Sequence, residues 1–116
     1  MFKRLRSEPV LLPQIIEETL RWLSPVQSAT RHVVRDCEIA EVRLEAGAKV
    51  NCMLGAANRD PNVFPDPDRF DIDRANLRRH LGFATGSHSC IGFNLAKTEV
   101  RIAIEKLLTL RRGAVI

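Results

Sequence analysis

A long irregular segment divides this chain and limits the folds it can adopt. Across residues 58–79 the apolar positions follow neither the helical nor the strand period, while prolines and aspartates are dense: Pro61, Pro65, Pro67, Asp60, Asp66, Asp68, Asp71 and Asp73. Such a length without regular structure is unusual inside a compact domain, and segments of this kind are often functional. We expect Phe64 and Phe70 to anchor this segment to a core.

Regular elements are predicted on both sides of the irregular segment. A helix is predicted over residues 13–23, because Pro13 suits a first helical position and Pro25 disfavours continuation. Its apolar face would carry Ile16, Leu20 and Leu23, and its polar face Gln14, Glu17, Glu18 and Arg21. Between residues 30 and 54, alternating apolar and polar residues predict two or three short antiparallel strands, with turns at 35–36 and 46–47.

A second helix is predicted over residues 91–110, after a glycine-rich stretch. Its buried stripe would consist of Ala96, Val100, Ala103, Ile104, Leu107 and Leu108. Its wet face would consist of Asn94, Lys97, Thr98, Arg101 and Glu105. The fold class expected is therefore mainly α with a small antiparallel β-sheet.

Length and composition limit the classes of protein that remain. The 116 residues, 45% of them hydrophobic and 28% charged, suit one globular domain, whose radius of gyration would be about 13 Å if it packed alone. Lys and Arg number 18 against 14 Asp and Glu, and the resulting +4 charge suits an acidic partner or a nucleic acid without deciding between them. No apolar run could span a bilayer, and no secretory signal is expected. Three cysteines without a C-x-x-C pair indicate a reducing cytoplasm.

The most informative residue is Cys90, which follows the glycine-rich turn at residues 82–92 and begins the second helix. Free N–H groups and the positive end of a helix favour a thiolate there, and that thiolate could be a nucleophile or a metal ligand. The alternative is a purely structural role, as a buried free cysteine. Flanking glycines favour the functional interpretation, because they allow a flat ligand to approach the backbone.

Other functions for this loop fit less well. A phosphate-binding loop would need Gly-Lys-Ser/Thr, and a dinucleotide fingerprint would need G-x-G-x-x-G; neither is present. Zinc could use His88 and Cys90, with His80 as a third ligand, but the spacing is not a usual zinc pattern. A cysteine hydrolase would need a histidine base, and nothing in the sequence places His32, His80 or His88 in that role.

A possible ion pair lies in the first helix. Arg21 can pair with Glu18, three residues away, or with Glu17, four residues away, and Arg69 could join either glutamate as a second cation. Local physics does not choose between the two glutamates. Taken alone, such pairs are more often solvated surface pairs, worth about 0.3–0.5 kcal/mol.

Three motifs in this order resemble the C-terminal part of a bacterial cytochrome P450. Glu18-Thr19-Leu20-Arg21 is similar to the family's E-x-x-R motif. Residues 64–70, read as Phe-Pro-Asp-Pro-Asp-Arg-Phe, are similar to the segment with its P-x-R-F motif. Residues 83–92 resemble the haem-binding loop F-G-x-G-x-H-x-C-x-G. The resemblance covers roughly residues 5–110, and the three motifs together are highly specific.

The resemblance implies a haem b cofactor and names its site. Cys90 would be the thiolate axial ligand of the haem iron, and Phe83 the aromatic residue beside it. Arg31 and His88 would contact the haem propionates. Glu18, Arg21 and Arg69 would form the family's buried charge triad, which selects Glu18 over Glu17.

The resemblance also implies an activity and partners. The family's reaction is monooxygenation, the insertion of one oxygen atom into a small apolar substrate. An acidic, ferredoxin-type electron donor would meet the basic residues that flank the Cys90 loop: Arg78, Arg79, Lys97 and Arg101. No nucleic-acid partner is expected, since the chain has no Tyr and one Trp and lacks a recognition-helix pattern.

Some features depart from the family pattern. Ala84 stands where glycine is usual, so the turn before Cys90 is expected to be strained or shifted. Phe93 replaces a usually small residue, and residues 40–41 (Ala-Glu) replace a common Gly-Gly turn. Family members are several times longer, so residues 1–116 are expected to be a C-terminal segment without the distal side of the haem pocket. No catalytic residue can be named. The alternative is a non-catalytic product of a truncated reading frame, at most a haem- or protein-binding module.

Overall fold

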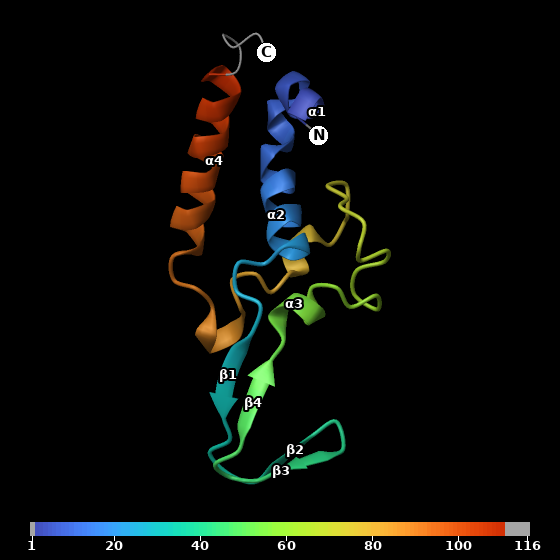
Figure 1. The fold of residues 1–116 in the computed structure, drawn as a ribbon, viewed down its shortest axis with the longest axis vertical. Helices are drawn as coiled ribbons and strands as arrows, with labels where there is room; N and C mark the ends of the chain where they lie inside the picture. The colour runs from blue at the N-terminus through green and yellow to red at the C-terminus, as the bar shows by residue number, and fades with distance from the viewer. Residues whose placement is uncertain (1, 111–116) are drawn as a thin grey trace.

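The computed structural model describes residues 2–110 and shows an elongated molecule. Its extents are 61 × 28 × 23 Å and its radius of gyration is 18.1 Å, well above the roughly 13 Å expected for a compact chain of this length. Helices occupy one end and paired strands the other, with the irregular segment at the side (Figure 1). The radius of gyration exceeds the compact value because the β-strands extend away from the helices and do not pack beneath them.

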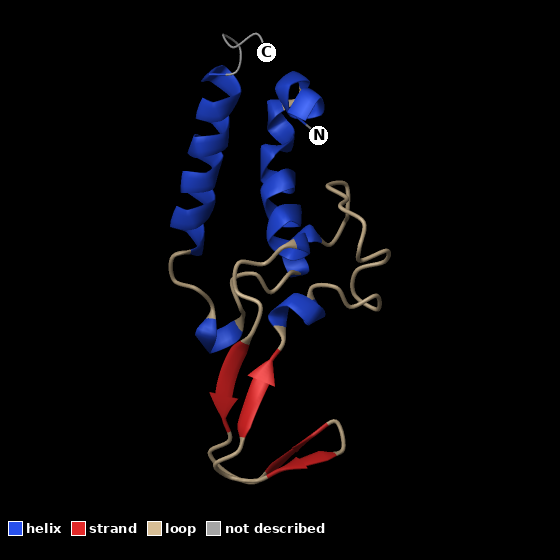
Figure 2. Cartoon of the chain, in the orientation of Figure 1, coloured by secondary structure: helices blue, strands red, loops and turns tan. Residues whose placement is uncertain are grey.

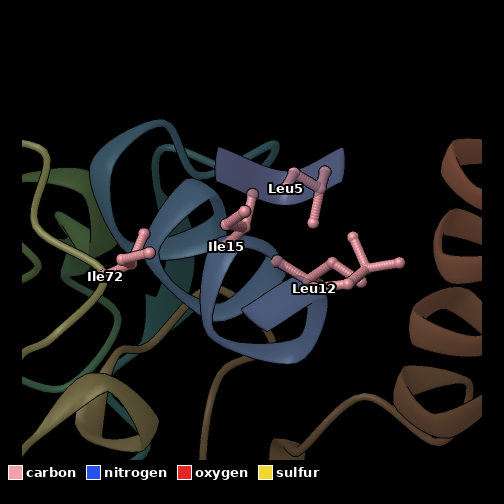
Figure 3. Packing of buried hydrophobic residues seen from close by; sticks show 5 residues of the cluster. Leu5, Leu12, Ile15 and Ile72 are labelled. Atoms are coloured by element: carbon pink, nitrogen blue, oxygen red, sulfur yellow. The ribbon is translucent and has the colours of Figure 1, made fainter. Parts of the chain in front are cut away.

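The helical end begins with three elements in succession: α1 (Phe2–Ser7), the 3-10 helix η1 (Pro9–Leu11) and α2 (Leu12–Trp22). Pro13 stands in the first turn of α2, as predicted, and the helix closes with the Leu23 N–H donating to the Thr19 carbonyl at 2.9 Å. The core cluster consists of Leu5, Leu12, Ile15 and Ile16 from these elements and Ile72 from the irregular segment (Figure 3).

The strands form two separate ladders and not the single sheet expected. Within residues 2–110, β1 (Ala29–His32) pairs antiparallel with β4 (Lys49–Cys52), and β2 (Cys37–Ile39) pairs antiparallel with β3 (Val42–Leu44) (Figure 2). Ala40 and Glu41 join β2 to β3 with φ of 47° and 64°. Two consecutive left-handed residues make a tight hairpin turn, which explains why glycine would suit these positions.

The irregular segment is held by buried side chains rather than by secondary structure. It follows the short helix α3 (Leu54–Ala57) and leads to the 3-10 helix η2 (Leu77–Arg79). Phe64, predicted as an anchor, is 1% exposed, and Phe70 packs against the core cluster. Asn58 is fully buried, where its Nδ2 donates to Ser24 Oγ and its Oδ1 accepts from the Leu81 N–H, both at 2.6 Å. Asn58 thereby joins the two ends of the segment to the end of α2.

The last helix, α4 (Phe93–Leu110), follows the 3-10 helix η3 (Gly86–His88) and lies beside α2. None of its residues is fully buried, so the predicted buried stripe is wrong in degree: Ala96, Ile104 and Leu108 are half-buried, while Val100, Ala103 and Leu107 are exposed. Between α2 and α4 runs an apolar groove of about 310 Å³, lined in part by Ile16, Leu20, Phe83 and Ile104.

Candidate functional site

The centre of the helical end is a buried ion pair between Glu18 and Arg21. Arg21 Nε lies 2.7 Å from Glu18 Oε2 and Nη2 lies 2.8 Å from Oε1, and both side chains are 0% exposed. The geometry is bidentate, the strongest form of a carboxylate–guanidinium contact. It confirms Glu18, and not Glu17, as the partner of Arg21. It also corrects the predicted helix face, because two residues assigned to the wet side are among the most buried in the described chain.

Arg21 also ties α2 to the irregular segment. Its Nη1 donates to the carbonyls of Asn58 and Pro67, each at 2.9 Å, and its Nη2 donates to the carbonyl of Arg69 at 3.1 Å. The ring of Phe64 lies 5.4 Å from the guanidinium carbon. A single side chain therefore satisfies three carbonyls of a segment that has no sheet or helix partner of its own.

The second cation on Glu18 is Arg74, so the predicted role of the Arg69 side chain is wrong. Arg74 Nε lies 3.2 Å from Glu18 Oε1, and its side chain is 6% exposed. Arg69 is exposed and contributes its backbone carbonyl, which accepts from Arg21 and, at 2.8 Å, from Arg74 Nη2. The turn at Asp66, with φ of 49°, brings another carbonyl to Arg74 Nη2 at 2.6 Å. The irregular segment thus wraps around Arg74.

Burial and hydrogen bonding act in opposite directions on Glu18. Burial raises the pKa of its carboxyl, but hydrogen bonds from Arg21, the Asp71 N–H at 2.8 Å and Arg74 outweigh that effect. The net pKa is lowered from the ordinary glutamate value. Glu18 is therefore an anion at neutral pH despite its burial, as a paired buried charge must be.

Glu17, on the neighbouring face of α2, forms a second cluster. Its Oε2 lies 2.9 Å from His80 Nε2 and its Oε1 lies 2.7 Å from Lys97 Nζ. Burial raises the pKa of the Glu17 carboxyl, yet the bonds from Lys97 and His80 leave the pKa lowered overall. The sequence analysis did not find this cluster, because its members lie 63 and 80 residues away from Glu17 and no local pattern links them.

The Cys90 loop connects these elements. The Cys90 N–H donates to the Phe83 carbonyl at 2.9 Å, and the Cys90 carbonyl accepts from the Phe93 N–H at 3.3 Å, which begins α4. The thiol is exposed, so the alternative of a buried structural cysteine is wrong. The predicted strain is present, since Ala84 has φ of 56° where glycine would be relaxed.

The other residues expected around Cys90 lie on different elements. Phe83 is half-buried, with its ring centroid 6.5 Å from that of His80 and 6.3 Å from that of Phe93. His88 is exposed in η3, and Arg31 is half-buried on β1, where its Nη1 donates to the Thr30 carbonyl at 2.9 Å. The structure thus brings Phe83 and Cys90 together by a backbone hydrogen bond, whereas Arg31 on β1 and His88 in η3 share no hydrogen-bond partner within residues 2–110.

The remaining alternatives can be set against the same geometry. Both ring nitrogens of His80 are engaged, Nε2 with Glu17 and Nδ1 with the Gly82 N–H at 3.0 Å, so His80 is not placed as a zinc ligand. Among residues 2–110, no group of three or more His, Cys, Asp or Glu side chains could hold a metal ion. In the same part of the chain, no helix is long and apolar enough to cross a membrane.

The basic residues near the loop are not equivalent. Arg78 and Arg79 on η2 and Arg101 on α4 are exposed. Lys97 is paired with Glu17, and its Nζ lies 5.6 Å from the ring centroids of both Phe83 and Phe93. Lys97 therefore belongs to the packing between α2 and α4 and not to the wet face predicted for it.

Comparison with known proteins identifies the family. The sequence profile of the cytochrome P450 family matches residues 4–110. Cytochrome P450 140 of Mycobacterium tuberculosis is 52% identical over 100 residues, which are 86% of this chain and 23% of that protein. The biotin biosynthesis cytochrome P450 of Bacillus subtilis is 45% identical over 105 residues, 90% of this chain and 26% of that protein. The chain spans about a quarter of the length of these relatives.

Solved structures agree in fold. CYP109E1 from Bacillus megaterium superposes with a TM-score of 0.89 at 42% identity, covering 93% of this chain and 28% of that one. P450BioI, solved in complex with an acyl carrier protein carrying a fatty acid, gives a TM-score of 0.87 at 44% identity, over 91% of this chain and 28% of that one. The mainly helical fold with small antiparallel ladders is thus the fold of this region in P450 structures. The family match over nearly all described residues and these superpositions show that the chain belongs to the cytochrome P450 family.

Proposed function

We propose that this chain binds haem b through the thiolate of Cys90 and serves in the monooxygenation of a small apolar substrate. Members of the cytochrome P450 family bind haem b, and family membership supports a monooxygenase type of function. The observation that carries the proposal is the position of Cys90. It is an exposed thiol at the start of α4, held by a backbone hydrogen bond to Phe83.

The surroundings of Cys90 suit a flat, iron-bearing ligand. A Cβ built on Gly92 would meet only Cys90 Sγ, at 3.9 Å, so the backbone on that side of the sulfur is open. Ile91 is fully exposed beside it, offering apolar surface to such a ligand. A cysteine thiolate is a soft, electron-donating ligand suited to haem iron. The donor chemistry and the open space therefore both fit the family's cofactor.

Each residue of this site has a distinct role in the proposal. Cys90 would supply a thiolate ligand for the iron, and the positive N-terminal end of α4 would favour its negative charge. Phe83 holds the Cys90 N–H through its carbonyl and packs its ring against His80 and Phe93. Arg31 and His88 provide a cation and a ring N–H for the cofactor's carboxylates. When bound, haem b supplies the one-electron and dioxygen chemistry.

The exposed cations near the loop suggest the partner. Arg78, Arg79 and Arg101 are exposed and would attract an acidic electron donor of the ferredoxin type. A reducing compartment such as the cytoplasm suits the chain, since its three cysteines are free and exposed.

The test is the reduced carbon monoxide spectrum of the chain after addition of haemin. We expect a thiolate-type band in the parent protein and its loss in Cys90→Ser. Cys52→Ser is the matched control, because Cys52 is also a free, exposed thiol but lies on β4, and it should retain the band. Free-haem behaviour in the parent, or a band that persists in Cys90→Ser, would overturn the assignment of Cys90.

A further inference from the structure

The position of Glu17 between two elements that flank Cys90 suggests a function for it. His80 precedes the Cys90 loop and Lys97 follows it, in the second turn of α4. The Glu17 carboxylate contacts both, one through each oxygen, at 2.9 and 2.7 Å. One residue of α2 thereby holds the chain before and after Cys90.

The contacts of His80 continue into the loop itself. Its Nδ1 accepts the Gly82 N–H at 3.0 Å, so Nε2 carries the ring proton that is donated to Glu17. A Cβ at Gly82 would approach His80 Nδ1 to 3.0 Å and the Leu20 carbonyl to 3.1 Å. The loop is therefore held closely against α2 one residue before Phe83, the residue whose carbonyl accepts the Cys90 N–H.

Lys97 completes the cluster from the other side. Its Nζ lies 5.6 Å from the ring centroids of Phe83 and Phe93, within range of a cation–π contact with both. These rings stand before and after Cys90 in the chain, and their centroids are 6.3 Å apart. Neutralised by Glu17, the ammonium can remain between two aromatic rings and α2.

We propose that Glu17 is a positioning residue for the Cys90 loop, acting through His80 on its entry and through Lys97 on its exit. This inference rests on the proposed function only for its effect on haem ligation, because the restraint on the loop is a property of the protein itself. Since the Glu17 carboxylate bonds His80 and Lys97, its effect is on the placement of the sulfur and not on its chemistry.

The first test needs no haem. Amide hydrogen exchange at the Cys90 N–H reports its hydrogen bond to the Phe83 carbonyl. Glu17→Gln should reduce the protection of this N–H roughly tenfold, because the carboxylate that accepts hydrogen bonds from both His80 and Lys97 loses its charge. Glu18→Gln is the control for general destabilisation, because Glu18 is the next residue of α2 and is buried, but contacts Arg21, Arg74 and Asp71. Its exchange at Cys90 should change only as far as global stability changes.

The second test uses the ligation spectrum. With haemin bound, Glu17→Gln and Lys97→Met should show a smaller fraction of the thiolate-type carbon monoxide band than the parent protein. Lys97→Arg keeps the cation and should show the same fraction of this band as the parent. Glu99→Gln, an exposed change on the same helix, should match the parent. The proposal would be overturned if the Cys90 N–H exchanged in Glu17→Gln as it does in the parent protein. It would also be overturned if Glu17→Gln and Glu18→Gln, compared at equal free energy of unfolding, lost the same protection at this N–H. If the parent shows no thiolate band, the proposed function fails, and the exchange experiment still decides the role of Glu17.

Discussion

Removal of either partner of the buried Glu18–Arg21 pair should strongly destabilise the fold. Both side chains are wholly buried, so the remaining partner would keep a charge that water cannot reach. Breaking such a pair typically costs about 3–5 kcal/mol. A chain of 116 residues has a free energy of unfolding of roughly 6–17 kcal/mol at the usual value per residue, so the loss would be a large part of the total.

The two single variants should differ in a way that the structure specifies. Arg21→Met removes the donor for the carbonyls of Asn58, Pro67 and Arg69 as well as the ion pair, so we expect the upper part of that range, about 4–5 kcal/mol. Glu18→Gln keeps the shape of the side chain and leaves Arg21 its carbonyl partners, so we expect about 2–3 kcal/mol. The double variant should lose less than the sum, by about 1–3 kcal/mol.

Urea unfolding followed by circular dichroism measures these differences, with the denaturant slope checked for constancy. Arg43→Met is the matched control, because Arg43 pairs with Asp36 at 3.3 Å while its side chain is 76% exposed. It should change stability by no more than about 0.5 kcal/mol. A loss below about 1 kcal/mol in Arg21→Met, or strict additivity in the double variant, would refute the reasoning from burial.

Further predictions follow from the same contacts. Arg74→Met should destabilise the chain by about 2–3 kcal/mol because it removes a nearly buried donor to Glu18, whereas Arg69→Met, at an exposed side chain, should stay within about 0.5 kcal/mol in the same urea assay; equal losses would contradict the assignment. The pKa values of Glu17 and Glu18 are lowered by folding, so their stabilisation is complete above the unfolded pKa of about 4.3 and is lost as pH falls through the folded pKa. Unfolding measured across this range should show a shallower acid decline in Glu18→Gln, and an unchanged decline would count against the linkage. Ala84→Gly should relieve the left-handed strain at φ of 56°. We expect the free energy of unfolding to rise by about 0.5–1 kcal/mol, and the melting temperature to rise with it; a lower melting temperature would show that the turn is not strained.

The sequence predicted the local elements well where the signal itself is local. The helix expected over residues 13–23 is α2 (Leu12–Trp22), because Pro13 and Pro25 mark its ends and its apolar spacing is regular. The irregular segment and its anchor Phe64 were likewise visible, since prolines at this density exclude regular structure. These local signals predicted a mainly helical class with antiparallel strands, and the structure confirms that class.

The exposure of the polar residues could not be predicted from periodicity. Glu18 and Arg21 appear on a wet face by spacing, but carbonyls of the distant irregular segment cover them. The resemblance corrected this for the pair and then selected the wrong second cation. Arg69 and Arg74 lie in the same segment, and only the path of the backbone decides that one offers its carbonyl and the other its guanidinium.

The position of the last helix and the contacts of Glu17 could not be predicted from the sequence either. The stripe of α4 has the spacing of a buried face, yet α2 covers it only in part. Lys97 and His80 appear in the sequence as an ordinary cation and a spare histidine. Their common partner, Glu17, becomes evident only when α2, the loop and α4 are placed together.

The central claim, that Cys90 ligates haem iron, is tested most directly by X-ray absorption at the iron edge of the haemin-loaded chain. The account predicts a sulfur atom in the first coordination sphere of the parent and of Cys52→Ser, and its replacement by nitrogen or oxygen in Cys90→Ser. An iron without a sulfur ligand in the parent protein, or one that keeps its sulfur in Cys90→Ser, would contradict it.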